Sequence, residues 1–188
     1  MTDEAQKRVG EIAREFYEKG DATGWFDTLY GEAAGDAAKI PWADLEPNPH
    51  FVAWLKKHPP KGAGKKALVV GCGLGDDAEE LARHDFRVTA FDISPKAIEW
   101  ARAIHPETPV DYRAADLFDL PDEWKGGFDF VLEIHTIQAL PVDLREKAVR
   151  AVGELVAPGG GELLVVGRGA DENEVPENPP FPLRKSDL

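Results

Sequence analysis

The stretch of sequence that decides the fold reads Val69-Val70-Gly71-Cys72-Gly73-Leu74-Gly75-Asp76-Asp77. The two valines predict the end of a buried strand, and the residues from about Asp76 to His84 predict a helix. A strand, a glycine-rich turn and a helix in direct succession are typical of the first crossover of a nucleotide-binding sheet. We therefore expect a cofactor to approach the backbone at Gly71, Cys72, Gly73 and Gly75.

The two acids after the glycines distinguish between cofactors. A dinucleotide-binding loop has a third glycine at position 76 and turns the bare N–H groups of the helix toward a pyrophosphate. Asp76 and Asp77 occupy that anion site here. They would repel a pyrophosphate but not S-adenosylmethionine (SAM), which has a ribose and no phosphate. The same acids stabilise the positive end of the helix dipole, by about 0.3–1 kcal/mol each when exposed.

The second and third predicted strands are each followed closely by an acid. Asp92 closes the second strand, where a carboxylate can accept hydrogen bonds from both ribose hydroxyls, with Ile93 beside it. The alternative for Asp92 is an ordinary turn residue before Ser94-Pro95. Asp116 follows the third strand, where it can face an adenine amino group while Leu117 contacts the ring.

Short β-branched runs alternate with helical patterns from Ala67 onward, which predicts parallel strands joined by crossover helices. The chain divides into a helical cap over 1–66, a SAM-binding core over 67–170 and a proline-rich segment over 171–188, all within one domain. We expect a helix from Val142 to Val156, and strands that are covered on both faces. The expected strands are Ala67–Gly71, Arg87–Asp92, Val110–Ala114, Phe128–Ile134 and Glu162–Gly167.

These features together resemble the class I SAM-dependent methyltransferases over residues 67–169. Within that superfamily, the glycine loop followed by Asp77, the pair Pro41-Trp42 and the run Glu133–Pro141 are similar to the thiopurine, thiol and halide methyltransferases. The resemblance implies an α/β Rossmann-like three-layer sandwich, with a mainly parallel sheet in the order 3-2-1-4-5 and an N-terminal helical cap. It also implies that Trp42 covers the cofactor, and that Glu133 and Ile134 line the floor beside the transferable methyl group.

The C-terminus differs from that group, which adds a helix and an antiparallel hairpin beyond the fifth strand. Without the hairpin, the run Leu163-Leu164-Val165-Val166 forms a bare apolar sheet edge, which proteins normally cover or pair. We expect either that the hairpin strands are missing because the chain is shortened, or that another copy completes the edge in a homodimer.

Residues of the cap and of the fourth strand are candidates for the acceptor side. A dry pocket with aromatic walls favours transfer to a thiolate or halide, because opposite charges disappear in the transition state. Candidates for these walls are Trp25, Phe26, Tyr30 and Trp42, although aromatic residues of a cap more often serve packing. His135 and Glu133 are candidate catalytic bases for an oxygen nucleophile, and a purely structural histidine is the alternative for His135.

Composition limits the other partners. The 22 Lys and Arg residues against 35 Asp and Glu give a net charge of −13, which argues against nucleic acid. Cys72 is the single cysteine, so no internal disulfide or multi-thiolate metal site is expected. No apolar run suggests a signal peptide or membrane anchor, and we expect a cytoplasmic protein.

The expected function is a SAM-dependent methyltransferase that acts on a small thiol, halide or similar nucleophile by in-line transfer. SAM would be the methyl donor and S-adenosylhomocysteine (SAH) the product. The alternatives are a SAM-binding protein without catalysis and, on the same type of sheet, a nicotinamide-dependent oxidoreductase.

Overall fold

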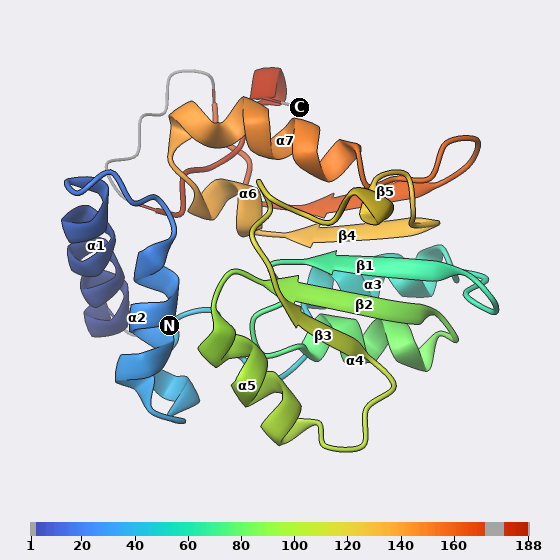
Figure 1. Cartoon of the computed structure of the whole chain (residues 1–188), viewed down its shortest axis with the longest axis horizontal. Helices are drawn as coiled ribbons and strands as arrows, with labels where there is room; N and C mark the ends of the chain where they lie inside the picture. Colours follow the sequence, from blue (N-terminus) through green and yellow to red (C-terminus); the bar gives the residue numbers. More distant parts are fainter. Residues whose placement is uncertain (1–2, 172–178, 188) are drawn as a thin grey trace.

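The computed structural model describes residues 3–171 and 179–187, with a five-stranded parallel sheet at its centre (Figure 1). The strands are β1 (Lys66–Val70), β2 (Arg87–Asp92), β3 (Asp111–Ala114), β4 (Phe130–Ile134) and β5 (Glu162–Val166). Their order across the sheet is β3-β2-β1-β4-β5, which confirms the expected Rossmann-like topology. The direction in which successive strands are added to the sheet reverses between β1 and β4. A ligand crevice is expected at the carboxyl ends of these two strands, at this topological switch point.

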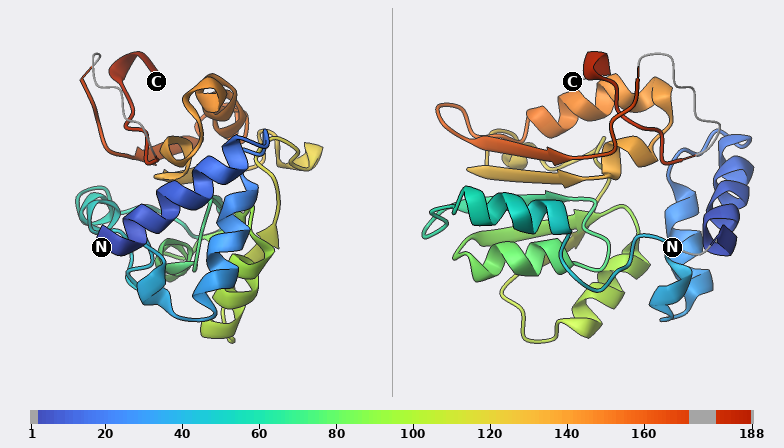
Figure 2. Two further views of the ribbon diagram at one scale, coloured as in Figure 1. Left: turned by 90° about the vertical axis from the view of Figure 1, so that its left-hand side faces the viewer. Right: turned by 180° about the vertical axis from the view of Figure 1, so that it is seen from behind.

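Helices cover both faces of the sheet and complete a three-layer sandwich (Figure 2). α3 (Pro49–Lys57), α4 (Asp76–Arg83) and α5 (Pro95–Ile104) pack on one face, and α6 (Thr136–Ala139) and α7 (Arg145–Gly153) on the other. The alternation of β1 explains the two layers, because successive side chains of a strand point to opposite faces. Ala67 and Val69 therefore join the first core, whereas Leu68 and Val70 join the second.

The two edge strands are covered less than the sequence predicts. β3 buries only Tyr112 of its four residues, and Leu163 of β5 is 41% exposed. The expectation that every strand is covered on both faces is therefore wrong for β3, whereas β5 is partly covered on both, because Leu164 packs against the first core and Val165 against the second. α5 covers one face of β3 through Tyr112, whereas the other face carries the charged side chains of Asp111 and Arg113, which stay in water.

The helix expected over 142–156 is shorter in the structure. A 3-10 turn, η3 (Val142–Leu144), comes first, and α7 ends at Gly153. Pro141 enters this turn in an extended conformation, with φ of −52° and ψ of 146°, so the regular helix starts one turn later than expected. Leu155 lies beyond the helix but remains buried in the second core.

Two N-terminal helices, α1 (Asp3–Tyr17) and α2 (Gly24–Ala33), lie across the carboxyl ends of the strands at the left of Figure 1. The 3-10 turn η1 (Ala37–Lys39) follows them. Their own core includes Trp25 and Leu29 together with Leu74 of the glycine loop. Asp27 ties α2 to α5: its Oδ1 accepts from Ser94 Oγ at 2.8 Å, and its carboxylate forms an ion pair with Lys96.

The described part of the proline-rich segment, residues 179–187, packs against α6 and α7. Phe181 N donates to Gln138 O at 2.6 Å, and Leu183 forms a parallel bridge with Gly169 just beyond β5. The described part of the segment includes the short turn η4 (Lys185–Asp187), and another such turn, η2 (Asp122–Trp124), follows β3. Residues 172–178 and residue 188 of the expected segment lie outside the described residues.

Within residues 3–171 and 179–187, no helix is both long and apolar enough to cross a membrane. The same residues contain no group of three or more His, Cys, Asp and Glu side chains placed to hold a metal ion.

Candidate functional site

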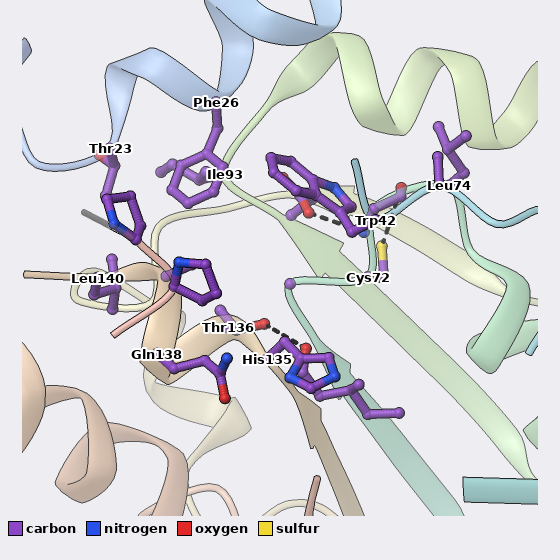
Figure 3. A pocket seen from close by; sticks show the side chains of 18 of the residues that line it. Thr23, Phe26, Trp42, Cys72, Leu74, Ile93, His135, Thr136, Gln138 and Leu140 are labelled. Carbon is purple, nitrogen blue, oxygen red and sulfur yellow. Dashed lines mark hydrogen bonds between the residues drawn. The ribbon is translucent and has the colours of Figure 1, made fainter. Parts of the chain in front are cut away.

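A cavity of about 430 Å³ opens over the carboxyl ends of the strands, between the sheet and the α1–α2 cap (Figure 3). Its lining comes from the glycine loop, the ends of β2 and β4, the segment after β3 and the cap. Pockets of about 300–1,000 Å³ are typical of small-molecule and cofactor sites. The cavity thus lies at the crevice that the strand order predicts.

The glycine loop forms the part of the cavity next to the end of β1. Gly71, Gly73 and Gly75 all have positive φ, a conformation that favours glycine. Close packing is a second reason at two of them, because an added Cβ would lie 2.2 Å from Thr136 Oγ1 at Gly71 and 2.1 Å from Tyr112 OH at Gly75. Gly71, Cys72 and Gly73 line the cavity, whereas Gly75 does not and serves as the N-cap of α4.

Asp92 lies at the end of β2 and connects this strand to the glycine loop. Its Oδ2 accepts from Gly73 N and its Oδ1 from Ser94 N, both at 2.9 Å. Burial raises the pKa of this carboxyl above its ordinary value, although the N–H donors oppose the rise. Each oxygen has a second lone pair, so Asp92 can also accept a hydrogen bond from a ligand. Asp92 and its neighbour Ile93 both line the cavity.

Asp76 and Asp77 begin α4 and also line the cavity. Asp77 Oδ1 accepts from Asn48 N at 2.7 Å, so this acid holds the segment before α3 against the glycine loop. Burial raises the pKa of Asp77 to about 6 and also raises the pKa of Asp76. The sequence indicates acids at the helix start, but it does not indicate this contact between residues 29 positions apart.

The segment after β3 forms a side wall of the cavity. Asp116 Oδ1 accepts from Phe118 N at 2.8 Å, which stabilises a turn, and Asp116 and Leu117 both line the cavity. Leu117 also belongs to the second core. The structure therefore brings the four residues expected to contact ribose and adenine to one side of the cavity, after β2 and β3.

Four aromatic side chains of the cap form another wall. Trp42 Nε1 donates to Tyr30 OH at 2.9 Å. The Trp42 ring also packs edge-on against the three other aromatic rings of this wall. Its centroid lies 6.1 Å from Trp25, 6.2 Å from Phe26 and 6.3 Å from Tyr30. Trp25 and Tyr30 are almost fully buried, whereas Trp42 is 39% exposed and lines the cavity beside the glycine loop (Figure 3). Trp42 is thus fixed by its neighbours and still presents part of its ring to a ligand.

The two candidate bases lie in different surroundings. His135 is exposed, lines the cavity and has a left-handed backbone with φ of 62°, an unusual conformation that is often found at functional sites. Glu133 is fully buried and does not line the cavity. Its Oε1 accepts from Ile137 N at 3.0 Å, its Oε2 has no hydrogen-bond partner, and burial raises its pKa to about 7. Ile134 lines the cavity between them.

Several cavity residues were not predicted from the sequence, namely Thr136, Gln138, Arg168, Pro179 and Pro180. Gln138 Oε1 accepts from Arg168 N at 2.7 Å, across 30 positions of sequence. Such a contact leaves no local periodic pattern. A single polar residue within the apolar run Ile137–Leu140 was the one available sign.

Comparisons with known proteins agree with this geometry. A family model described as a methyltransferase domain matches residues 67–160, which is half of the chain. The ubiquinone biosynthesis O-methyltransferase of Chromobacterium violaceum is 37% identical over 117 residues, which cover 61% of this chain and 49% of that protein. The chain spans about half the length of the curated relatives it matches. Because these relatives are named O-methyltransferases, the finer resemblance to the thiopurine, thiol and halide group stays a prediction.

Solved structures have the same fold. A chain from a study of the conversion of a disulfide bond into a thioacetal group during echinomycin biosynthesis has a TM-score of 0.65 and 29% identity, covering 78% of this chain and 60% of that chain. The SAM-dependent methyltransferase of Mesorhizobium loti has a TM-score of 0.51 and 26% identity, covering 64% of this chain and 53% of that chain. With the family match over the strands and the glycine loop that build the cavity, the chain belongs to the methyltransferase-domain family.

Proposed function

We propose that this chain binds SAM in the cavity and transfers its methyl group to a small-molecule nucleophile. The observation that supports this most strongly is Asp92. It lines the cavity at the end of β2, and its carboxylate also holds Gly73 of the glycine loop. The same carboxylate thus holds the glycine turn in place and offers oxygens that can accept hydrogen bonds from a ribose.

The donors and acceptors of the cavity fit SAM. A ribose has two hydroxyl donors and adenine has an amino donor, and the cavity offers carboxylate acceptors at Asp92 and Asp116. Ile93 and Leu117 supply the apolar surface that a purine ring needs. The two acids at the start of α4 disfavour a pyrophosphate and suit the cationic groups of SAM.

In this proposal, bound SAM supplies a methyl group activated by its sulfonium, and the chain supplies positioning and a dry site. In-line alignment of reactants contributes up to about 7–11 kcal/mol to such reactions. The aromatic wall around Trp42 would exclude water, and its ring faces favour a nearby cation by about 0.5–2 kcal/mol. His135 is the candidate base, because it lines the cavity and its imidazole can take a proton from a hydroxyl. Glu133 would hold the start of α6 through Ile137 N rather than contact the acceptor.

The identity of the acceptor atom is a finer proposal. The curated relatives are named O-methyltransferases, which supports an oxygen acceptor, whereas the resemblance to the thiopurine, thiol and halide group supports thiols and halides. We infer that a phenolic hydroxyl is the first acceptor to test, since a phenol needs the base that His135 offers. A thiol needs less help because its ordinary pKa is about 8.5.

An acceptor panel tests this function. The full chain would be incubated with methyl-labelled SAM and catechols, phenols, thiols, halides or thiocyanate, and the labelled product measured. Transfer to at least one acceptor, and loss of transfer in His135→Asn for phenols alone, would support the proposal. SAM binding without transfer to any acceptor would instead favour the binding protein without catalysis.

We also propose that a second copy of the chain completes the open sheet edge. β5 pairs with β4 on one side, no described strand pairs with its other side, and Leu163 is exposed there. Sedimentation of the full chain should show a dimer that the substitution Leu163→Lys converts to a monomer. A wild-type chain that stays monomeric at high concentration would contradict this proposal.

A further inference from the structure

We propose that Gln138 selects the methyl acceptor, because its side-chain amide donates a hydrogen bond to an uncharged carbonyl oxygen of that molecule. This rests on the proposed function and names the class of acceptor for the same cavity. The decisive feature is the direction in which the Gln138 carboxamide is held beside the end of β4.

Gln138 is a polar side chain in an apolar position. It belongs to the short helix α6, is only 2% exposed and has the buried neighbours Ile137 and Leu140. It nevertheless lines the cavity. A buried polar group that lacks a hydrogen-bond partner costs free energy, so such groups are normally paired. The partners of the two ends of this carboxamide therefore show what it can still bind.

The oxygen end of the carboxamide faces the chain just beyond β5. Oε1 accepts from Arg168 N at 2.7 Å, and a Cβ added at Gly167 would lie 3.0 Å from the same oxygen. If the carboxamide were turned over, the N–H groups of Gln138 would face the N–H of Arg168, and two donors cannot bind each other. The hydrogen-bond network therefore fixes the oxygen toward the backbone.

The nitrogen end of the carboxamide is left for the cavity. Within residues 3–171 and 179–187, no group accepts a hydrogen bond from Gln138 Nε2. Nε2 is also not one of the described side-chain atoms that are both unpaired and shut off from solvent, so it keeps access to the cavity. Figure 3 shows this nitrogen turned toward the middle of the cavity and the oxygen turned away. A bound molecule would thus meet a donor at this point.

The backbone of Gln138 is held by the C-terminal segment. Its carbonyl oxygen accepts from Phe181 N at 2.6 Å, and Phe181 O accepts from Arg145 Nη2 at 2.8 Å. Arg145 is only 4% exposed, and its Nη1 donates to Asp187 Oδ2 at 2.6 Å. The buried ion pair therefore anchors the segment that holds Gln138, and Arg145 is a positioning residue for it.

Gln138 lies on the side of the cavity that SAM leaves open. In the proposed function Asp92 and Asp116 hold the ribose and the adenine, after β2 and β3, so the acceptor binds over the end of β4. His135 and Gln138 are three positions apart at the start of α6, and such residues share one face of a helix. One molecule can therefore offer a hydroxyl to His135 and a second oxygen to Gln138. Because Gln138 is uncharged, it leaves the imidazole neutral, as a base requires.

The surroundings of this donor are largely apolar. Phe26 comes from α2, Leu140 from the chain after α6 and Pro180 from the C-terminal segment (Figure 3). Thr136 also lines the cavity, but its hydroxyl donates to Val70 O at 3.0 Å, so its hydrogen is already used. A donor among apolar walls discriminates well, because a ligand without a matching oxygen leaves the donor unpaired.

Charge favours an uncharged oxygen over a carboxylate. Acidic side chains line much of the cavity, and the chain as a whole has a net charge of −13. This field does not attract anions. The acids that line the cavity at the glycine loop and after β2 and β3 are Asp76, Asp77, Asp92 and Asp116. The acceptor class is therefore a small phenol that carries an aldehyde or ketone group.

Paired phenols test this preference. The ortho, meta and para hydroxyacetophenones, and the three isopropylphenols in which a methyl group replaces the carbonyl oxygen, would be titrated calorimetrically into the full chain saturated with SAH. We expect at least one ketone to bind about tenfold or more tightly than its isopropyl analogue. Equal binding in every pair, tighter binding of every isopropylphenol, or no binding of any ketone would overturn the inference.

The Gln138 amide can also be observed directly. The chain has two glutamines, Gln138 and Gln6 of α1, so glutamine labelled with nitrogen-15 in its side chain gives one pair of N–H signals for each. The substitution Gln6→Met leaves the pair that belongs to Gln138. The tightest-binding ketone should move a proton of this pair downfield, whereas its isopropyl analogue should not. No shift with that ketone, or the same shift with both compounds, would contradict the proposed hydrogen bond.

Substitutions identify the residue responsible. Gln138→Met removes the donor and should reduce the preference for the ketone to about twofold or less, with the affinity for SAH unchanged. Gln138→Glu keeps an oxygen for Arg168 N and replaces the donor by an acceptor, so at pH 8 it should lose the preference as well. Gln6→Met makes the matched change at the other glutamine and should retain the preference.

A preference that survives in Gln138→Met would overturn the assignment. If Gln138→Met does not fold, survival of the preference in Gln138→Glu would overturn it instead. Failure of the wild-type chain to bind SAH would be a different result, which refutes the proposed function itself.

Discussion

Replacing Glu133 by glutamine should change the pH dependence of stability. The Glu133 side chain is fully buried, with Oε1 bound to Ile137 N and Oε2 without a hydrogen-bond partner. Burial raises its pKa from 4.5 to about 7 in the folded chain. The folded state therefore binds more protons than the unfolded state between these values, and stability falls as pH rises through that window.

The expected magnitude follows from the two pKa values. With 4.5 in the unfolded chain and about 7 in the folded chain, ionisation of Glu133 costs about 2.5 kcal/mol of unfolding free energy between pH 5 and pH 8. Glutamine has the shape of the protonated acid and keeps the acceptor for Ile137 N. The variant should thus resemble wild type at pH 5 and be more stable by about 2–3 kcal/mol at pH 8.

Urea denaturation at several pH values measures this difference directly. Asp77 also has a raised pKa, but it is present in both proteins, so its contribution cancels when the two pH profiles are subtracted. Glu146→Gln is the matched control, because Glu146 is exposed on α7 and pairs with the exposed Arg150 one turn later. If wild type and Glu133→Gln had parallel profiles from pH 5 to pH 8, the account of Glu133 as a buried acid with a raised pKa would be refuted.

Three further predictions concern the C-terminal segment, the glycine loop and the candidate base His135. Arg145→Gln should lower the free energy of unfolding in urea by about 3–5 kcal/mol, because it leaves Asp187 without its buried partner. Arg150→Gln, which breaks an exposed ion pair on the same helix, should cost under about 1 kcal/mol. Equal effects of the two substitutions would contradict the idea that Arg145 anchors the C-terminal segment. Gly75→Ala should destabilise the chain by about 2 kcal/mol or more in thermal melts, since φ is 94° there and the new Cβ would clash with Tyr112 OH. Gly153→Ala, at a helical position with open space around it, should be neutral or stabilising in the same assay. His135→Asn, which tolerates the left-handed backbone, should slow transfer to a phenol by about 10²–10⁴ and leave SAH binding intact; unchanged turnover from pH 6 to pH 9 would exclude His135 as the base.

The central parts of the fold could be predicted because they leave periodic or local signals. β1 is a continuous apolar run after Lys66, the glycines need positive φ, and the Ser94 Oγ caps α5 by accepting a hydrogen bond from Ala97 N. Each of these signals lies within a few residues of sequence. The strand order was predicted from the family resemblance, and the structure confirms it.

The rest of the cavity depends on contacts between distant segments. Ser94 and Asp27 are 67 positions apart, and Arg145 and Phe181 are 36 apart, so neither pair produces a pattern in the sequence. The family resemblance implies that Glu133 lines the floor, but after the left-handed turn at His135 its carboxyl accepts from Ile137 N of α6. Whether Glu133 has a catalytic role stays a prediction, since its side chain does not line the cavity.

Calorimetric titration of the full chain with SAH tests the central claim most directly. The account predicts that wild type binds SAH, and that Asp92→Asn weakens binding by about 10- to 100-fold, because the amide loses the charge and turns an N–H group toward Gly73 N or Ser94 N. Asp129→Asn should leave SAH binding unchanged, since Asp129 accepts from Lys66 N at the opposite end of the strands. Tight binding of NADH with no response to SAM or SAH would contradict the account.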